Sequence, residues 1–270
     1  MKQLLSIFLL LAGIQTSLPA QYYGVKSQAE TTWNIGLTAG ISVVKGDISV
    51  RQPGLQVGLY GQKSISPALD LRLHINSGQA LGLNTTVSVG DSLIPFMAPY
   101  DSLPMYHNFR MKYHDVGVLL KINLNRLGGS GSENWELYGL AGVGTLLYRT
   151  DMDLLDANGS IYNYAERVSG TDPSAIKNEL LNLLDGVYET PAEQDYLNKS
   201  NLGNRAFSTM FSLGFGLNIN VSERIGIGLE GRYGFVGDDL LDGLQWNADR
   251  SPSEDRDALL NATLGIRVNL

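Results

Sequence analysis

The chain has 270 residues, with 20 Lys and Arg against 27 Asp and Glu, a formal net charge of -7, 31 glycines and no cysteine. The lack of cysteine excludes a disulfide scaffold, a thiolate nucleophile and a lipid-modified N-terminal Cys, and three scattered histidines argue against a His-based zinc site. An acidic balance without a Lys/Arg cluster argues against a nucleic-acid partner.

The first 20 residues have the features of a secretory signal peptide. Lys2 is followed by an apolar run over 4–14 and by small or polar residues up to Ala20, after which we expect cleavage. The competing interpretation is a buried core helix. No later run approaches the ~20 consecutive apolar residues of a transmembrane helix, so residues 21–270 are expected to form a single exported domain.

The rest of the chain contains eight segments in which apolar and polar residues alternate, the period of a β-strand with two different faces. The clearest example is Leu69, Leu71, Leu73 and Ile75, which alternate with polar residues at 70, 72, 74 and 76. The strands are expected at about 33–44, 54–63, 69–76, 112–124, 135–149, 206–219, 225–236 and 258–270.

The connections between these segments alternate in length. Those at 64–68, 125–134 and 220–224 are short, whereas those at 77–111, 150–205 and 237–257 are long. An even number of strands, with tight turns on one side and long loops on the other, is typical of an outer-membrane barrel. We therefore predict an all-β fold, an eight-stranded antiparallel up-and-down transmembrane β-barrel with both termini in the periplasm.

The composition of the two strand faces decides between this fold and a soluble lipocalin-like barrel. The polar face consists mainly of small residues with few charges, as expected for a narrow lumen, and the opposite face is aliphatic, with Trp33, Trp135 and Tyr233 near strand ends, as expected for lipid contact. The charged or titratable lumen residues are expected to form a structural ionic network, with a proton or ion relay as the alternative: Asp70, Arg72, His74, Asp115, Lys121, Glu136, Glu230, Arg232 and Arg267.

Three segments resemble the OmpA/OmpX-like family of small outer-membrane β-barrels, especially OmpA-type N-terminal barrels. They are 33–40 (WNIGLTAG) leading to Gly46-Asp47, 135–144 (WELYGLAGVG) and 240–243 (LLDG). The resemblance implies a Gram-negative outer-membrane location and outer-membrane lipid as a partner. The given sequence ends at Leu270, so the resemblance does not extend to the peptidoglycan-binding domain of OmpA proteins and cell-wall tethering is not expected. The last residue is Leu instead of the Phe common in such barrels. The alternating end of the chain is still expected to be recognised by the barrel-assembly machinery during insertion.

The loop at 150–205 contains the most local structure. Asn158-Gly159 predicts a type I′ turn in a hairpin that prolongs the fifth strand above the membrane. Asp172-Pro173 then predicts the start of a short amphipathic helix. Its apolar stripe is expected to cover the barrel mouth, lie on the outer leaflet or contact a protein partner, and it consists of Ile176, Leu180, Leu183, Leu184 and Val187.

No catalytic, cofactor or metal motif was found. His74 lies among lumen charges, His107 is expected in a loop and His114 on the apolar face. Acidic residues recur at 151, 153 and 156 and at 238, 239 and 242, but their spacing does not match a calcium loop, so a solvated acidic surface is expected.

We therefore expect a non-enzymatic barrel with a plugged lumen and a structural or surface-interaction role. The alternatives are a subunit of a secretion or uptake assembly, a lipid-modifying barrel enzyme and a soluble lipocalin-like binder.

Overall fold

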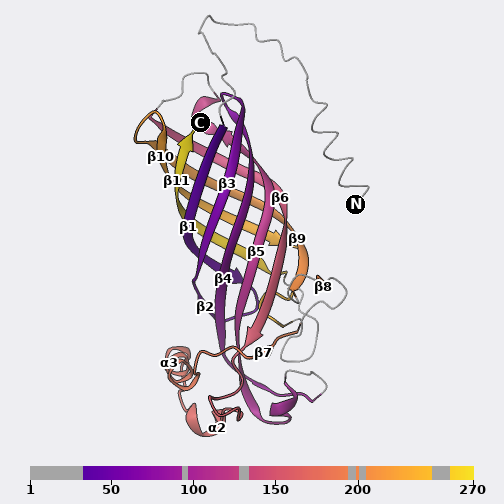
Figure 1. The fold of residues 1–270 in the computed structure, drawn as a ribbon. Coiled ribbons are helices and arrows are strands. Elements are labelled where there is room, and N and C mark those ends of the chain that lie inside the picture. Colours follow the sequence, from indigo (N-terminus) through magenta and orange to yellow (C-terminus); the bar gives the residue numbers. More distant parts are fainter. Residues whose placement is uncertain (1–32, 93–96, 128–133, 194–198, 201–204, 245–255) are drawn as a thin grey trace, which may run out of the picture. The chain divides into compact units, whose positions relative to one another are not determined.

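The computed structural model describes residues 33–92, 97–127, 134–193, 199–200, 205–244 and 256–270, and the expected signal peptide at 1–20 lies outside them. Within these residues, eight long antiparallel strands form a closed ring (Figure 1). In ring order they are β1 (Trp33–Lys45), β3 (Gly54–Ser66), β4 (Leu69–Val89), β5 (Pro104–Asn123), β6 (Trp135–Met152), β9 (Arg205–Asn220), β10 (Ile225–Val236) and β11 (Ala258–Asn269). The pairing of β1 with β11 closes the ring, as predicted.

The other elements lie in the connections. They are the strands β2 (Val50–Gln52), β7 (Thr190–Pro191) and β8 (Lys199–Ser200), the 3-10 helices η1 (Ala98–Tyr100) and η2 (Leu124–Arg126), and the α-helices α2 (Tyr164–Arg167) and α3 (Pro173–Leu183). Among the described residues, none of these helices has the length and apolar content needed to cross a bilayer. The short connections at 67–68, 124–134 and 221–224 share one end of the ring with both strand termini, Trp33 and Asn269. We call it the turn end and the opposite end the loop end.

The strand faces are polar inside and apolar outside. Phe215 is 71% exposed and Leu264 is 63% exposed, whereas Lys121 and Asp115 are completely buried. A soluble barrel requires the opposite arrangement, because its outer surface faces water and its core excludes it. The lipocalin-like alternative is therefore wrong for this chain.

β4 and β5 extend much further toward the loop end than the alternation predicted. They remain paired from Ser77 with His114 to Leu83 with Asn108, and the pairing resumes at Val87 with Tyr106 after a register shift. His107 therefore lies in a strand, and the expected loop at 77–111 is largely a hairpin. The alternation of apolar and polar residues did not predict this extension for two reasons. Neighbouring segments pack against both faces of the two strands, and the register shift interrupts the two-residue period.

The long loop between β6 and β9 differs from the prediction in two respects. Among the described non-glycine residues only Ser102 has a positive φ, so Asn158-Gly159 does not form the type I′ turn, which needs positive φ at both positions. Instead, the Asp156 carboxylate accepts hydrogen bonds from the amides of Asn158 and Ser160, and of the two residues Asn158 and Gly159 it is Gly159 that has a positive φ, 78°. Also, α3 begins as expected at Pro173 but ends at Leu183.

Two clusters of buried apolar side chains lie toward the loop end. The mouth core fills the barrel interior there and comprises Val44, Ile48, Ala80, Phe109, Met111, Tyr113, Leu146, Tyr148, Ala206, Met210, Val236, Leu240, Leu241 and Leu259. The head core joins the β4–β5 extension to the β6–β9 loop and comprises Leu83, Met97, Tyr100, Met105, Met152, Leu154, Tyr162, Tyr164, Leu180 and Ala192. The β6–β9 loop and the β4–β5 extension thus form a folded head around a shared apolar interior.

Candidate functional site in the barrel interior

The lumen contains three successive layers of charged side chains, which begin at the turn end. In the first, Lys121 contacts both Asp70 and Glu136, at 3.3 and 2.8 Å. Arg267 also binds Glu136 at 2.8 Å, and Arg126 binds its other oxygen at 3.3 Å. One carboxylate therefore contacts three cations, which offsets the cost of removing these ions from water.

The second layer is built around Arg72. Its guanidinium binds Glu230 at 2.5 Å and lies over the ring of Tyr60, 4.2 Å from the centroid. The hydroxyl of Tyr138 donates to the same Glu230. Tyr138 can cross the lumen because Gly216 lies opposite: a Cβ there would come within 2.3 Å of the tyrosine ring. The many small residues of the lumen face thus provide room for large interior side chains.

The third layer joins His74, Asp115 and Arg232. The His74 Nε2 atom lies 3.1 Å from both Asp115 oxygens and 2.8 Å from Arg232, which also forms an ion pair with Asp115. Asn76 donates a further hydrogen bond to Asp115. A cavity of about 20 Å³, lined by side chains of the second and third layers, has room for about one water molecule.

All nine charged or titratable lumen residues that the sequence predicted lie in these layers and make ion-pair or hydrogen-bond contacts with one another. Among these nine, four cations, Arg72, Lys121, Arg232 and Arg267, balance four carboxylates. The prediction missed the amide side chains that join the ions. Gln62, for example, donates to Asp70 and accepts from Arg72.

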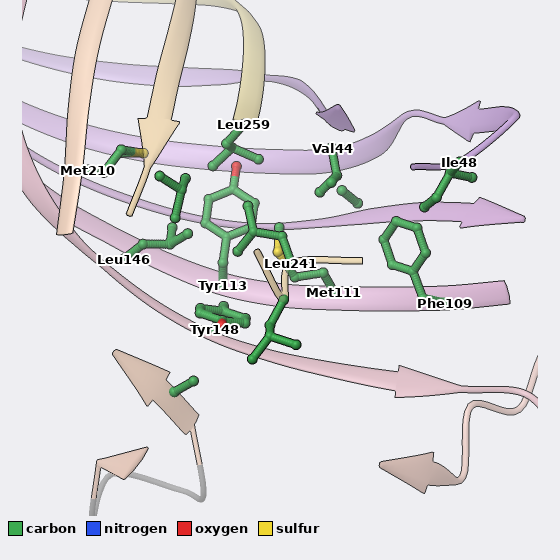
Figure 2. Close-up of a cluster of buried hydrophobic side chains, with 14 residues drawn as sticks. Val44, Ile48, Phe109, Met111, Tyr113, Leu146, Tyr148, Met210, Leu241 and Leu259 are labelled. Atoms are coloured by element: carbon green, nitrogen blue, oxygen red, sulfur yellow. The ribbon is translucent and has the colours of Figure 1, made fainter. Parts of the chain in front are cut away.

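On the loop-end side of the third layer, the interior is filled by the apolar side chains of the mouth core, which Figure 2 shows. Leu241, from the connection between β10 and β11, is completely buried there beside Tyr113 and Met111. Thr150 donates to the Leu241 carbonyl at 2.9 Å. The segment that closes the barrel mouth therefore comes from the β10–β11 connection, and the expected lid, α3, packs in the head core instead.

Two buried carboxylates hold this segment in place. Asp257 accepts hydrogen bonds from the amides of Leu241 and Asp242, and the Asp242 carboxylate accepts from the amide of Asp47. A Cβ on Gly46 would meet oxygens of both carboxylates within 2.5 Å, so the two groups converge on this glycine. Burial is the main cause that raises the pKa of both groups; repulsion from Asp47 adds to the rise at Asp242, and repulsion from Asp242 adds to it at Asp257.

Three of the six acidic loop residues do not lie on the solvated surface that the sequence suggested. Asp151, Asp153 and Asp242 are all more than nine-tenths buried. Asp153 accepts from the Tyr162 hydroxyl at 2.7 Å and the Gly186 amide at 2.8 Å, and burial raises its pKa to about 6. Asp153 and Asp242 thus order the connections by binding backbone or hydroxyl donors, whereas Asp151 is paired with Arg149. Within the described residues, no cluster of three or more metal-ligating side chains is found.

The apolar residues of α3 face the head. Leu180 is completely buried in the head core, and Ile176, Leu183 and Leu184 pack against it. Val187 lies beyond the helix and is 59% exposed, so it does not continue the stripe. The stripe predicted for a partner or the outer leaflet is therefore occupied within the chain.

The closed ring, the polar interior and the apolar outer face define a transmembrane β-barrel. No family model and no curated protein matches the chain. Among solved structures it is similar to Neisserial surface protein A, with 9% identity and a TM-score of 0.43 over 88% of this chain and 97% of that one.

Two further similar structures are also outer-membrane barrels. One is Ail, the attachment invasion locus protein of Yersinia pestis, with 13% identity and a TM-score of 0.41 over 89% of this chain and 99% of that one. The other is the outer-membrane protease OmpT of Escherichia coli, with 9% identity and a TM-score of 0.40 over 93% of this chain and 99% of that one. The similarity concerns the fold.

Proposed function

We propose that the protein is a non-enzymatic outer-membrane β-barrel with a closed lumen, which displays its folded head at the cell surface for interaction with a partner. The filling of the lumen carries this proposal. Three ionic layers occupy the turn half, and the mouth core, with Leu241 at its centre, occupies the loop half. A barrel of eight strands has just enough interior for such side chains, so a water-filled channel is not expected.

The ionic layers are proposed to specify strand register and to plug the barrel. A proton relay needs a polar path from end to end. Here the third layer is followed by Met111, Leu146 and Leu259 of the mouth core, which provide no such path.

The histidine contacts support a role without catalysis. His74 is engaged by Asp115 and Arg232, and His107 binds the backbone carbonyl of Asp242 at 3.0 Å. Both rings thus take part in interior packing and hydrogen bonding. Hydrolysis assays on peptides and phospholipids, with the purified barrel in mixed micelles, test this part of the proposal, and turnover abolished by His107→Gln would contradict it.

Orientation is tested with two matched epitope insertions. Gly159 lies at the exposed tip of a head turn, and Glu223 lies in the exposed turn between β9 and β10. An epitope after Gly159 should be detected on intact cells, whereas one after Glu223 should be detected only after the outer membrane is permeabilised. The reverse pattern would contradict the proposed orientation, and no labelling of either in the membrane fraction would contradict the location.

Closure of the lumen is tested by conductance. Wild-type protein in planar bilayers should show no steady ion current, and Leu241→Gly, which removes the central side chain of the mouth core, should allow at most brief openings because the ionic layers remain. A stable wild-type current would contradict the closed lumen.

A further inference from the structure

Three cationic residues lie on the outer faces of adjacent strands, at the loop-end edge of the apolar belt; on β5, His114 lies between Lys112 and the last apolar outward residue, Val116. On β6 the outward positions run from Trp135 through Leu147 and then reach Arg149. On β9 they run from Ile219 through Phe207 and then reach Arg205. The third residue, on β5, is described below.

The length of this run places the cations at the headgroup level. Residues 135–147 rise about 3.3 Å each and, at a tilt of about 40°, span about 30 Å, slightly more than the ~25 Å apolar band of a barrel. A side chain directly after this run therefore lies at the lipid headgroups of the loop-end leaflet and not among the acyl chains.

The register brings the three cations together. Lys112 of β5 is paired directly with Arg149 of β6, and Tyr148 is paired with Ala206, so Arg149 and Arg205 each lie one residue beyond that pair. Lys112 is exposed, and the Arg149 side chain is 36% exposed. Among the described residues, the ion pair within this patch is that of Arg149 with Asp151, at 2.8 Å. The patch therefore keeps an excess of positive charge.

We propose that Lys112, Arg149 and Arg205 form a binding surface for the phosphate groups of an anionic glycolipid in the outer leaflet. Like charges on neighbouring strands repel each other, and this cost is removed when one anion bridges them. Guanidinium groups bind phosphate in bidentate geometry, and lysine adds a point charge. The inference rests on the membrane orientation proposed above.

The opposite side of the barrel differs. The outward residues near the loop end of β10 and β11 are Phe235 and Leu260, both apolar and exposed. On β1, Lys45 is exposed at the corresponding end. Its pairing partner on β11 is Ala258, so the adjacent position on that strand is not a second cation. Lys45 is thus a matched control: a single outer-end cation outside the patch.

The test uses the double variant Lys112→Gln/Arg205→Gln, which leaves the Arg149–Asp151 ion pair intact. Wild type, this variant and Lys45→Gln are reconstituted in phosphatidylcholine vesicles with and without diphosphoryl lipid A, and the unfolding temperature of each is measured. A ligand that binds only the folded state raises this temperature. Lipid A should stabilise wild type and Lys45→Gln equally and bind the double variant at least about tenfold more weakly.

Three further measurements separate the outcomes. The charge-preserving variant Lys112→Arg/Arg205→Lys should retain the stabilisation, which shows that loss in the double variant is due to charge. A shift of gel mobility on boiling reports insertion, so failure of the barrel to insert is distinguished from failure to bind lipid. Equal stabilisation of all variants by lipid A would overturn the proposal, as would inorganic phosphate that reproduces the whole effect at the same phosphate concentration.

Discussion

The turn half and the loop half of the barrel interior are filled by opposite chemistries. In the turn half, Glu136 contacts Lys121 and Arg267, and both partners come from other strands of the wall. In the loop half, Leu241 comes from a connection and packs on apolar side chains of the wall. The wall therefore fills one half with its own residues, whereas the other half depends on a segment that must fold back into it.

This difference predicts different consequences of damage. An ionic contact between two strands of the wall stabilises the whole ring. If one partner is removed, the other charge stays buried without a counter-ion, because its strand cannot leave the ring. A contact made by a connection is lost when the connection alone moves out, and the ring survives. Substitutions in the two halves should therefore separate global from local unfolding.

The largest effect is expected from Glu136→Gln, which removes the negative charge that three cations share. The free energy of unfolding in phospholipid vesicles, followed by tryptophan fluorescence in urea, should fall by about 3–5 kcal/mol. Glu223→Gln, in an exposed turn, should change it by less than about 0.5 kcal/mol. Similar small effects of both substitutions would show that the first layer does not stabilise the ring.

Leu241→Ala should cost about 2–3 kcal/mol, and the loss should be local. Hydrogen exchange of the amides at 240–244 should accelerate, whereas exchange in β1 and β11 should remain slow and the gel mobility shift should be unchanged. Leu181→Ala, at a leucine that is 47% exposed in α3, serves as the control and should leave exchange at 240–244 unaltered. Cooperative loss of the whole ring in Leu241→Ala would contradict the separation of the two halves.

The sequence predicted the turn half better than the loop half for a physical reason. Strict alternation assigns a face to every residue of a regular strand, so Asp70, Arg72 and Arg267 could be placed in the lumen without knowing their partners. The pairing of strands then brings such residues together, because register is fixed wherever the two faces differ. The same alternation places Gln62 on the lumen face, but nothing in the sequence shows that it bridges Asp70 and Arg72.

The loop half lacks such a period. Nothing in the spacing of Leu240 and Leu241 distinguishes a segment that plugs the barrel from one exposed to solvent. The helical period in 173–183 correctly indicated a helix but did not reveal that Leu180 would be covered by the β4–β5 extension. An amphipathic pattern shows that a face will be buried, and the fold decides what covers it.

The pair Asp242 and Asp257 makes the loop half pH-sensitive. The pKa of both is raised in the folded state, so the stabilisation of this segment is complete below the ordinary carboxyl pKa of about 4 and is lost as the pH rises through the higher folded values. The facing titratable groups are Asp47, Asp239 and the ring of His107. Amides at 240–244 should therefore open more readily in alkali than in mild acid, after correction for intrinsic exchange.

Asp257→Asn should flatten this dependence, since Asn keeps an acceptor for the Leu241 amide and removes one of the two charges. A shift of one pKa unit corresponds to about 1.4 kcal/mol, which sets the scale of the expected difference between acid and alkali. Asp156→Asn, at an exposed carboxylate whose pKa is lowered by two backbone amides, should leave the pH dependence of 240–244 unchanged. An identical profile for Asp257→Asn and wild type would contradict the role of the pair.

The smallest effect is expected in the head, where α3 is capped by Asp172. Its carboxylate accepts from the amides of Ser174 and Ala175, at 2.9 and 3.0 Å. Asp172→Ala should lower the local stability of α3 by about 1 kcal/mol, because two amides at the helix start lose their acceptor. Asn178→Ala, on the exposed side of the same helix, should instead raise it by a few tenths of a kcal/mol, since alanine has the higher helix propensity.

Hydrogen exchange within 174–183 measures both changes in the same molecule, with the ring as an internal reference. α3 packs on the head core and makes no contribution to the strand ladder. Neither substitution should therefore alter exchange in the parts of β5 and β6 that lie between the His114–Leu147 pair and the turn end. Opposite signs in α3 with an unchanged ring would show that the head folds as a unit carried by the barrel. A loss of protection in the ring after Asp172→Ala would show instead that the head and the loop half stabilise each other.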